Sequence, residues 1–319
     1  MKNLFIFVVA LSTTIVCGCN NSQKCKDGCV SKAGQIASAC NSSKALEQTA
    51  HLKVASYNIQ FATTTTSQYW QSRKDGAKNL LAYHDFDIVG LQETHQHQID
   101  YFMPKHCAYI GMGINSYGKD KGGNSPIMYR KDKVEVLKWG YFWISETPEV
   151  LSNGWDCSRR RICTWGEFKD KASGKKLFYF NTHLDHKGKV ARVEGVKLLM
   201  KKIPQIAGDT PFVLTGDFNI AINSPAIKPM LESKEFVHAL NVSIAKPYYP
   251  ETGTFHGYTG IPRVFIDYLF VSPKIKVLNY AVLTDRICNP KFDPTKSIKK
   301  QNMVDYASDH FPVVSEISF

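Results

Sequence analysis

Apart from one apolar run close to its N-terminus, the sequence lacks long apolar stretches. After residue 20, no stretch of this 319-residue chain is apolar over the roughly 20 positions that a membrane-spanning helix needs. The chain is also short of acidic side chains, with 28 Asp and Glu against 40 Lys and Arg and a formal net charge of +12. We therefore expect everything after residue 20 to be soluble. The positive charge favours polyanionic partners such as nucleic acid or anionic lipid, although lysines that only solvate the surface would produce it as well.

No repeat, linker or break in composition occurs after about residue 51. The chain is 43% hydrophobic and 12% aromatic, which is ordinary globular composition, and it is long enough to bury a sizeable core. One domain is therefore predicted over residues 51–319.

The N-terminus has the features of an export signal. Lys2 precedes an apolar run of about 13 residues at 4–16, the size of a signal-peptide core. The run ends in Val16-Cys17-Gly18-Cys19, which resembles a bacterial lipobox with Cys19 as the thiol that receives lipid. We predict a signal peptide over 1–19 and export to the cell envelope as a lipoprotein anchored through Cys19. A plain cleaved signal, giving a secreted protein, and an uncleaved anchor are the alternatives. The lipid anchor would be the only contact with a membrane.

Nine cysteines are many for this length, and an exported chain lies where disulfides persist. Residues 20–50 are rich in Ser, Lys, Gly and Ala, which is typical of a flexible tether. Three of the cysteines fall in this tether: Cys25, Cys29 and Cys40. Without a fitting His or fourth Cys we favour disulfides or free thiols there over a metal clip. Cys157 and Cys163 flank a basic loop and are a second candidate pair.

Hydrophobic patterning predicts strands mixed with helices across residues 51–319. Strands are expected at 52–60, 87–92, 109–115, 125–129, 134–144, 162–169, 177–181, 212–215, 264–271, 277–283 and 313–318. Helices are expected at 68–83, 95–103, 189–206 and 225–232. These are too many strands for a simple doubly wound sheet. The mixture indicates an α/β sandwich, in which two packed mixed β-sheets are flanked by helices.

Several of these β-rich runs end in polar residues of the same chemical kind. They are Tyr57-Asn58, Gln92-Glu93, Thr182-His183, Gly216-Asp217-Phe218-Asn219, Ile266-Asp267 and Ser308-Asp309-His310. Each alone has a structural explanation, such as a turn at Asn58 or an Asx turn at Asp217. Together they are harder to explain, because apolar neighbours would bury Asp217 and Asp267, and a buried carboxylate needs a paired charge or a metal. No Gly-x-Ser-x-Gly elbow occurs, and the cysteines lie outside these motifs, so a Ser or Cys nucleophile is not expected.

The motifs resemble those of the endonuclease/exonuclease/phosphatase superfamily, whose fold is deoxyribonuclease I-like. The resemblance runs in family order from about residue 52 to the C-terminus. It rests on Tyr57-Asn58-Ile59, Leu91-Gln92-Glu93-Thr94, Asn181-Thr182-His183-Leu184, Gly216-Asp217-Phe218-Asn219, Ile266-Asp267-Tyr268 and Ser308-Asp309-His310-Phe311-Pro312-Val313. It implies a four-layer α/β sandwich and a phosphoester hydrolase. The bacterial secreted branch is more similar to this chain than are the abasic-site endonucleases.

The resemblance also implies a metal site. Glu93 would be the principal ligand of Mg²⁺ or Mn²⁺, with Asn58 and Asp309 beside it, because hard oxygen ligands suit these ions. Two departures from the family leave a second metal position, or the pairing of His183, open. Gln60 stands where some branches have an acidic residue, and no Glu precedes the Ser125-Pro126 strand.

The remaining motif residues would carry the reaction, again by resemblance. Asp217 would orient or deprotonate the attacking water, and Asn219 would hold that water or a phosphate oxygen. His310, aligned by Asp267, would stabilise the phosphoryl group as charge accumulates. His183 would donate to another phosphate oxygen. Positioning and electrostatic stabilisation provide most of phosphoryl-transfer catalysis.

Other candidates carry weaker signals. Arg161, in the run Ser158-Arg159-Arg160-Arg161, is expected to bind substrate phosphate, since guanidinium binds phosphate in bidentate fashion; otherwise the run is a solvated loop. Asp185-His186 and Arg192 follow the His183 motif and resemble a feature of the bacterial branch, with Arg192 as a second phosphate contact, although helix pairing or capping would also explain them. Four aromatic residues could line a cleft or belong to the core: Trp143, Trp155, Trp165 and Phe255. Four histidines match no ligand spacing and are expected at the surface: His84, His95, His97 and His106.

The sequence thus predicts a divalent-metal-dependent hydrolase that acts on phosphoester bonds. The favoured reaction is that of a nuclease-like phosphodiesterase, with nucleic acid as one candidate substrate. A secreted phosphatase or a sphingomyelinase-like phospholipase C is the first alternative, although no Trp-Cys-Asp-Arg run typical of inositol phosphatases occurs. A catalytically silent binding module is the second, and the presence of the whole motif set is evidence against it. No protein partner is predicted.

Overall fold

The computed structural model describes residues 49–62, 70–114, 123–249, 253–301 and 303–319. The predicted signal peptide, and the predicted tether as far as residue 48, lie outside the described residues. The same holds for four cysteines discussed above: Cys19, Cys25, Cys29 and Cys40. Within the described ranges, no helix combines the length and the apolar character needed to span a bilayer.

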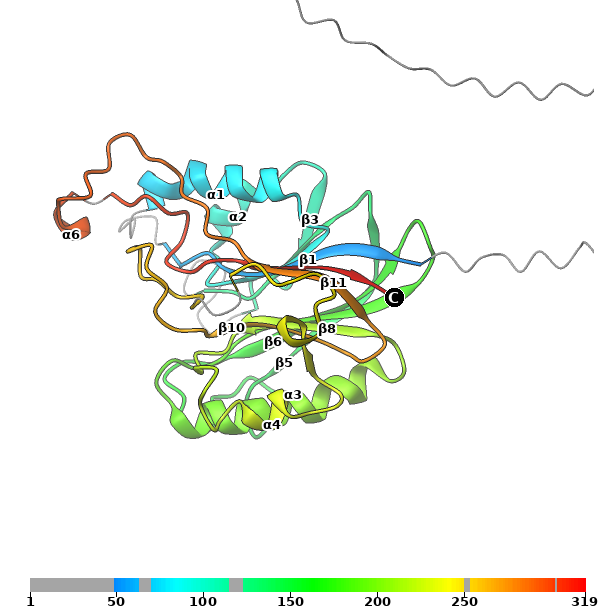
Figure 1. Ribbon diagram of the computed structural model, residues 1–319. Coiled ribbons are helices and arrows are strands. Elements are labelled where there is room, and N and C mark those ends of the chain that lie inside the picture. Colours follow the sequence, from blue (N-terminus) through cyan, green and yellow to red (C-terminus); the bar gives the residue numbers. More distant parts are fainter. Residues whose placement is uncertain (1–48, 63–69, 115–122, 250–252, 302) are drawn as a thin grey trace, which may run out of the picture. The chain divides into compact units, whose positions relative to one another are not determined.

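Two six-stranded mixed sheets form the middle of the fold (Figure 1). The first has the order β11-β12-β1-β2-β4-β3, with bounds Lys276–Val282, Val313–Ser318, His51–Asn58, Ile88–Gln92, Ile127–Arg130 and Cys107–Ile110. The second has the order β5-β6-β7-β8-β10-β9, with bounds Val134–Trp143, Ile162–Asp170, Lys176–His183, Phe212–Asp217, Asp267–Val271 and Val237–His238. Among the paired strands of the described residues, β1-β2 and β7-β8 are parallel and the other pairs are antiparallel. Each of the parallel pairs is joined by a crossover that contains a long helix, as parallel strands require.

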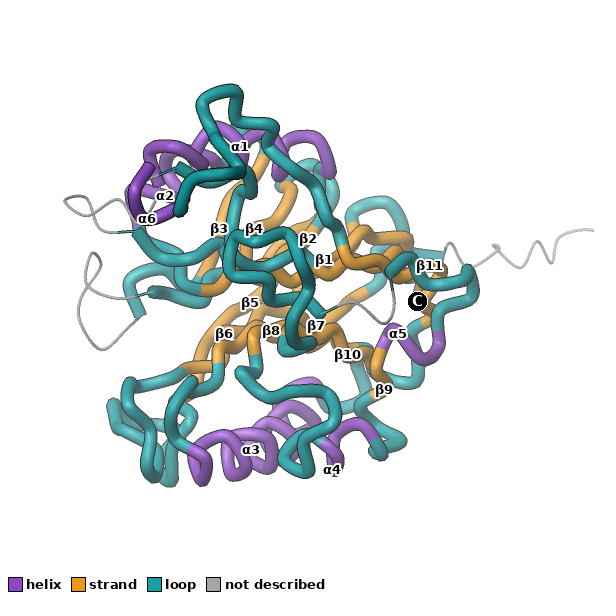
Figure 2. Tube along the Cα trace, turned by 60° about the vertical axis from the view of Figure 1, so that its left-hand side comes forward, coloured by secondary structure: helices purple, strands orange, loops and turns teal. Residues whose placement is uncertain are grey.

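Helices cover the outer faces of both sheets (Figures 1 and 2). Helices α1 and α2 lie over the first sheet, and α3 and α4 lie over the second. The short helices α5 and α6 complete the set. In chain order the bounds are Trp70–His84, Gln96–Phe102, Lys189–Ala207, Lys228–Leu231, Ala239–Val242 and Ile298–Gln301. The predicted α/β sandwich, two mixed sheets flanked by helices, is thereby confirmed.

Two apolar cores hold these layers together, and strand β1 contributes to both. Leu52 and Val54 belong to the core that lies between the sheets and continues under α3. Ala55 and Tyr57 belong to the second core, which contains Leu81 of α1. Because successive side chains of a strand point to opposite faces, one strand can pack against a sheet on one side and a helix on the other. This pattern fixes the register of β1 and with it the position of the motif at its end.

The observed helices and strands differ from the predicted ones in two respects: some strands are shorter, and some very short elements were not predicted. The strand expected over 109–115 ends at Ile110, because Gly111 and Gly113 adopt φ values of 80° and 79° that leave the extended region. The strand expected from residue 264 begins at Asp267. Strand β9 and the short helices α5 and α6 were not predicted, since two to four residues carry no periodic signal.

Two of the predictions are wrong: the pairing of Cys157 with Cys163 and the surface position of His95. Cys157 and Cys163 are both free thiols. Cys163 is buried in the core between the sheets, whereas Cys157 lies on the loop before β6, so the two do not meet. His95 is not at the surface: only 2% of it is exposed. It precedes α2 in a capping box with Gln98, and its ring stacks near Phe61. Patterning missed this because a capping histidine leaves no periodic mark.

His238 is buried among aromatic rings, and neither ring nitrogen has a hydrogen-bond partner in the described part of the chain. Burial lowers its pKa to about 3. The unfolded chain binds a proton near pH 6.5, but the folded protein does not, so stability is lost as pH falls from about 6.5 toward 3. At pH 5 we expect this site to cost about 2 kcal/mol of unfolding free energy. Urea denaturation of wild type and His238→Phe at pH 7.5 and 5.0 measures it. Equal losses for the two proteins would rule the effect out.

Candidate active site

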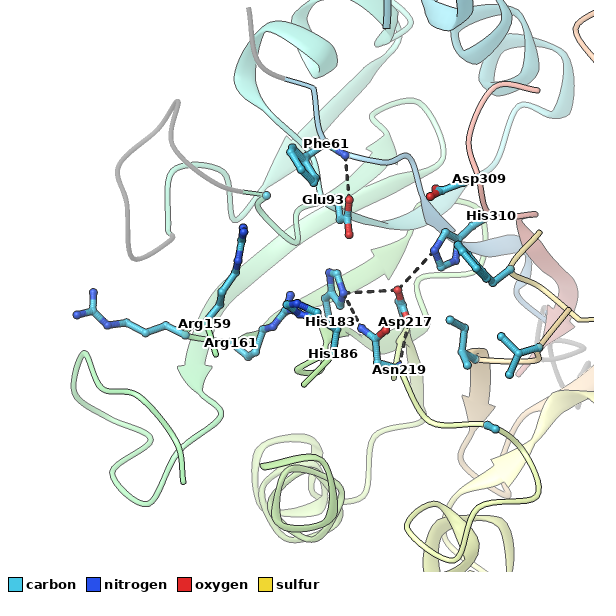
Figure 3. Close-up of a pocket in the computed structure, with 16 residues that line it drawn as sticks. Phe61, Glu93, Arg159, Arg161, His183, His186, Asp217, Asn219, Asp309 and His310 are labelled. Carbon is cyan, nitrogen blue, oxygen red and sulfur yellow. Dashed lines mark hydrogen bonds and ion pairs between the residues drawn. The ribbon is translucent and has the colours of Figure 1, made fainter. Parts of the chain in front are cut away.

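The predicted motifs meet at one edge of the sandwich. The strands of the two parallel pairs, β1-β2 and β7-β8, all present their carboxyl ends there, and β10 begins there because it runs antiparallel to β8. The edge opens into a cavity of about 600 Å³ (Figure 3). Its lining consists of Phe61, Glu93, Gly123, Arg159, Arg160, Arg161, His183, His186, Asp217, Asn219, Ala221, Phe255, Val264, Ile266, Asp309 and His310. Carboxylates, imidazoles and guanidinium groups thus face one cavity.

His310 and Asp267 form a hydrogen-bonded pair at the base of the site. The His310 Nδ1 atom lies 2.9 Å from Asp267 Oδ2, and both residues are buried. Although burial opposes the charged ring, the Asp267 carboxylate raises the pKa of His310 well above its ordinary value. The imidazole is therefore protonated at neutral pH. Its other nitrogen, Nε2, lies 3.8 Å from Asp217 Oδ2 (Figure 3).

Asp217 is held in a fixed orientation by amide donors. Its Oδ2 accepts from Asn58 Nδ2 at 2.9 Å, and its Oδ1 accepts from the Asn219 backbone N–H at 2.9 Å. Burial raises the pKa of Asp217 to about 7, and the neighbouring charge of Asp267 acts in the same direction. A carboxylate with such a pKa can take up a proton near neutral pH.

His183 lies on the other side of Asp217, with its Nε2 atom 3.5 Å from Oδ2 of that carboxylate. Burial lowers its pKa well below the ordinary value, and the charge of Arg161 adds to the effect, so the ring is neutral. The Asn219 side-chain amide lies 3.0 Å from Nε2 and also donates to the Leu184 carbonyl. In this arrangement Nε2 accepts a hydrogen bond. The predicted role of His183 as a phosphate donor thus requires the other tautomer and stays a prediction.

Glu93 and Asp309 fit the donor set of a divalent metal. Both carboxylates line the cavity. Glu93 Oε2 accepts from the Phe61 N–H at 3.0 Å, and Asp309 Oδ2 accepts from Gln60 Nε2 at 3.1 Å. Each carboxylate still has lone pairs that can bind a cation. Burial raises the pKa of Asp309, against the opposing charge of His310 and with the charge of Glu93. Two carboxylates in one cavity repel each other unless a cation lies between them. Hard oxygen ligands of this kind suit Mg²⁺ or Mn²⁺.

A second group of ligand atoms lies deeper. One ligand atom each from Asp217, Asp267 and His310 lies within 4.8 Å of the other two, and all three residues are buried. This cluster could also bind a divalent metal. However, the contact between Asp267 and His310 already uses a proton of the imidazole, which a metal would have to displace. The oxygen-only pair Glu93 and Asp309 therefore fits a hard cation better.

Asn58 is placed differently from the other predicted ligands. It does not line the cavity, since its amide donates to Asp217 and its Oδ1 accepts from the Gln60 N–H at 2.9 Å. Its predicted role as a metal ligand rests on the second lone pair of Oδ1. Gln60 itself was noted only as a departure from the family. Its amide contacts Asp309 and accepts from the Tyr258 hydroxyl, a link between loops that sequence spacing does not reveal.

Three site residues have left-handed backbone conformations. The φ values are 53° at Gln60, 61° at Glu93 and 51° at Asn219. A side chain with a Cβ atom adopts this region at a cost of roughly 1 kcal/mol or more. Gly123 packs against Glu93 so closely that a Cβ atom there would lie 2.5 Å from the Glu93 Cα atom. The left-handed backbone at Glu93 is thus also confined by the segment at Gly123.

The two predicted phosphate-binding arginines have different positions. Arg161 lines the cavity, with Nη2 3.3 Å from His186 Nδ1 (Figure 3). Arg192 does not line it: its guanidinium donates to the Asp185 carbonyl at 3.0 Å. Its position on α3 directs the side chain to the backbone after β7, and its predicted phosphate contact stays a prediction. Arg159 and Arg160, which were not singled out, line the cavity as well.

Of the four aromatic candidates, only Phe255 lines the cavity, where its ring packs 5.0 Å from that of His310. Trp143 is buried, and Trp155 and Trp165 pack against the core between the sheets. The tryptophans are thus structural, as strand aromatics usually are.

A family model described as the endonuclease/exonuclease/phosphatase family matches residues 55–310. The chain belongs to the endonuclease/exonuclease/phosphatase family. The match includes every motif as far as His310, and it confirms the resemblance to the family. Members of this family hydrolyse phosphoester bonds, and the protein is accordingly a phosphoester hydrolase.

Solved structures of the family have the same fold. A family member from Bacteroides thetaiotaomicron is 36% identical, with 85% of this chain and 99% of that chain covered and a TM-score of 0.75. A mannosyl-6-phosphatase from the same species is 36% identical, with 84% of this chain and 100% of that chain covered and a TM-score of 0.74. TDP2 from D. rerio, complexed with a single-strand DNA product, is 17% identical, with 84% of this chain and 99% of that chain covered and a TM-score of 0.63. At that identity the likeness is one of fold alone.

Proposed function

We propose that this protein is a metal-dependent phosphatase that hydrolyses a sugar phosphate monoester such as a mannosyl 6-phosphate. The observation that carries the proposal is the cationic wall of the cavity, in which Arg159, Arg160 and Arg161 face the same space as the protonated His310. A phosphate monoester carries a charge of about −1.5 to −2 near neutral pH, more than the single charge of a diester. The 36% identity to a mannosyl-6-phosphatase over that protein's full length supports the same substrate class.

The side chains can divide the reaction as follows. Arg161 and His310 bind phosphoryl oxygens and stabilise the charge that accumulates on them. Asn219 holds a water molecule against Asp217, whose carboxylate accepts the proton as the water oxygen bonds to phosphorus and the ester bond to the sugar breaks. Glu93 and Asp309, with Asn58, would hold the metal, which would supply positive charge at the phosphate oxygens. Above pH 7 a larger fraction of Asp217 is ionised and able to accept the proton.

We place this reaction outside the cytoplasm, on the basis of the predicted signal and lipobox at residues 1–19. An exported phosphatase anchored through Cys19 would meet sugar phosphates released from glycans at the cell envelope.

A nuclease-like phosphodiesterase is the second candidate. The net charge of +12 favours it, because a basic surface raises the local concentration of nucleic acid. The cavity chemistry does not select it, since a diester offers less charge to the arginines. A sphingomyelinase-like phospholipase C has no specific observation in its favour.

A substrate panel separates these candidates. With Mg²⁺ or Mn²⁺ present, the full chain should release phosphate from mannose 6-phosphate with a kcat/KM about 100-fold or more above that for bis(p-nitrophenyl) phosphate. Plasmid DNA, RNA and sphingomyelin should remain intact, and EDTA should abolish the release. Cleavage of DNA or of the diester, without phosphate release from any sugar phosphate, would show that the phosphodiesterase prediction is the right one.

A further inference from the structure

Asp185 is buried directly after β7, and the mechanism above gives it no role. Only 2% of the residue is exposed. Its carboxylate accepts hydrogen bonds on both oxygens from two segments that are far apart in the sequence. Oδ1 faces the start of α3, where it accepts from the N–H groups of Lys187 and Gly188 at 2.8 Å each. Oδ2 faces the segment 158–161, which we call the arginine loop.

The contacts on the loop side are also within hydrogen-bond distance, although slightly longer than those on the helix side. Oδ2 accepts from the Ser158 N–H at 3.1 Å, from the Ser158 hydroxyl at 2.9 Å and from the Arg159 N–H at 3.1 Å. Although burial opposes ionisation, the N–H groups of Gly188 and Lys187, together with Ser158, hold the pKa of Asp185 well below its ordinary value. The carboxylate is therefore charged and shapes the backbone from which the arginines project.

The ends of the loop are fixed independently. The Arg161 carbonyl accepts from the Ile144 N–H at 2.8 Å, which continues the pairing of β5 with β6. At the other end, Gly154 packs so closely on Ile144 that a Cβ atom would lie 2.2 Å from its carbonyl oxygen. Between Gly154 and Arg161, Asp156 ties the segment before the loop to α3, and Asp185 bonds to the backbone of residues 158 and 159.

The arginines of the loop line the cavity while Asp185 holds the loop backbone. Arg161 Nε lies 3.7 Å from Asp185 Oδ2, too far for a hydrogen bond, so the ion pair leaves the guanidinium available to another acceptor. Arg159 and Arg161 both line the cavity. A guanidinium whose backbone is fixed loses less freedom when it binds an anion, which increases affinity.

We propose that Asp185 is a positioning residue that holds the arginine loop as a preformed wall for the anionic group of the substrate. This rests on the proposed function, because it takes the wall to bind substrate phosphate. It assigns Asp185 to substrate binding and not to the chemical step. If Asp185 only capped α3, its substitution would lower stability but would not change the affinity for phosphate.

The test uses the full chain, with Asp185→Asn as the main variant. An amide whose oxygen stays toward the N–H groups of α3 turns its NH₂ group toward the N–H groups of the loop. We expect KM for mannose 6-phosphate to rise about tenfold or more, with kcat changed less than about twofold. Inorganic phosphate, titrated calorimetrically into metal-free protein in EDTA, should bind about tenfold more weakly than to wild type.

Asp156→Asn is the matched control. The Asp156 carboxylate accepts from the N–H groups of Ala191 and Val190 in the first turn of α3, and it bonds to no residue of the arginine loop. The Asp156→Asn variant should have a lower melting temperature than wild type but the same KM and the same affinity for phosphate. Ser158→Ala, which removes one donor to Asp185 and leaves the core intact, should raise KM by about twofold and provides the test if Asp185→Asn does not fold.

The outcomes separate the two proposals. If Asp185→Asn folds and binds phosphate as wild type does, or if Ser158→Ala leaves KM unchanged when it is the only folded variant, the positioning role is wrong. If no sugar phosphate is hydrolysed but phosphate affinity still falls in Asp185→Asn, the proposed function fails and the role of Asp185 stands.

Discussion

His310→Ala is expected to lower kcat by about 1000-fold or more, with a much smaller rise in KM. In the structure this imidazole is buried, pairs with Asp267 and carries a positive charge in the cavity. The charge on the phosphoryl oxygens increases toward the transition state, so an interaction with a fixed cation strengthens along the reaction. Alanine removes the cation and leaves the Asp267 carboxylate buried without its partner. Initial rates at saturating sugar phosphate measure the loss.

Two variants give this prediction its controls. Asp267→Asn keeps the imidazole but removes the charge that holds it protonated, so activity should fall and its dependence on pH should shift toward the acidic side. Asp217→Ala removes the proton acceptor and should lower kcat to a similar extent as His310→Ala. Calorimetric titration of Mn²⁺ should show that all three variants still bind the metal through Glu93 and Asp309. A His310→Ala enzyme that keeps more than about a tenth of the wild-type kcat would exclude the proposed role.

Arg73→Met is expected to lower the unfolding free energy by about 3–5 kcal/mol. Arg73 lies on α1 with none of its surface exposed, and its guanidinium donates to three backbone carbonyls. Two belong to the segment after β1, Ile59 at 2.6 Å and Gln60 at 2.7 Å, and the third is Ala307 at 2.9 Å. No carboxylate of the described residues lies within ion-pair distance of it. Methionine would leave the buried Ile59 and Ala307 carbonyls without a donor from the described residues, at about 1–3 kcal/mol each, while the Gln60 carbonyl keeps the Gln98 side-chain amide at 3.0 Å.

The consequences of that substitution should extend to the site. The carbonyls that Arg73 binds lie one or two residues from Asn58 and from the Ser308-Asp309 motif, so their release should also weaken metal binding. Lys78→Met, on the exposed face of the same helix, is the matched control and should change stability by less than about 0.5 kcal/mol. Guanidinium chloride denaturation compares the two variants with wild type. Equal stability of Arg73→Met and Lys78→Met would show that the buried guanidinium does not hold these loops.

The sequence was most informative where the chemistry is local. The motifs ending at Asn58, Glu93, His183 and Asp217 could be predicted to converge, because strand ends in a sandwich share an edge and each motif follows an apolar run. The strand content likewise excluded a simple doubly wound sheet. Signals that depend on neighbours within a few residues, such as periodicity and motif spacing, are those a sequence carries most directly.

What escaped prediction depends on contacts between distant segments. Arg73 reads as one more polar residue of an amphipathic helix, yet it contacts Ala307, 234 positions away. Asp185 accepts from N–H groups at the start of α3, as a cap would, but it also bonds to residues 158 and 159, which residue spacing does not reveal. The bond from Arg192 to the Asp185 carbonyl likewise leaves no mark in the residue spacing. Such pairings are set by packing and by the need of buried polar groups for partners.

The left-handed backbone at Gln60, Glu93 and Asn219 has a consequence for laboratory evolution of this enzyme. A screen that rewards heat resistance alone should recover glycine at these three positions early, since glycine adopts such φ values without strain. The replacements would remove the proposed metal ligand Glu93, the Gln60 side chain that contacts Asp309, and the Asn219 amide proposed to hold the reacting water. Heat-resistant but inactive clones should therefore carry changes at the very positions that a screen for turnover leaves untouched.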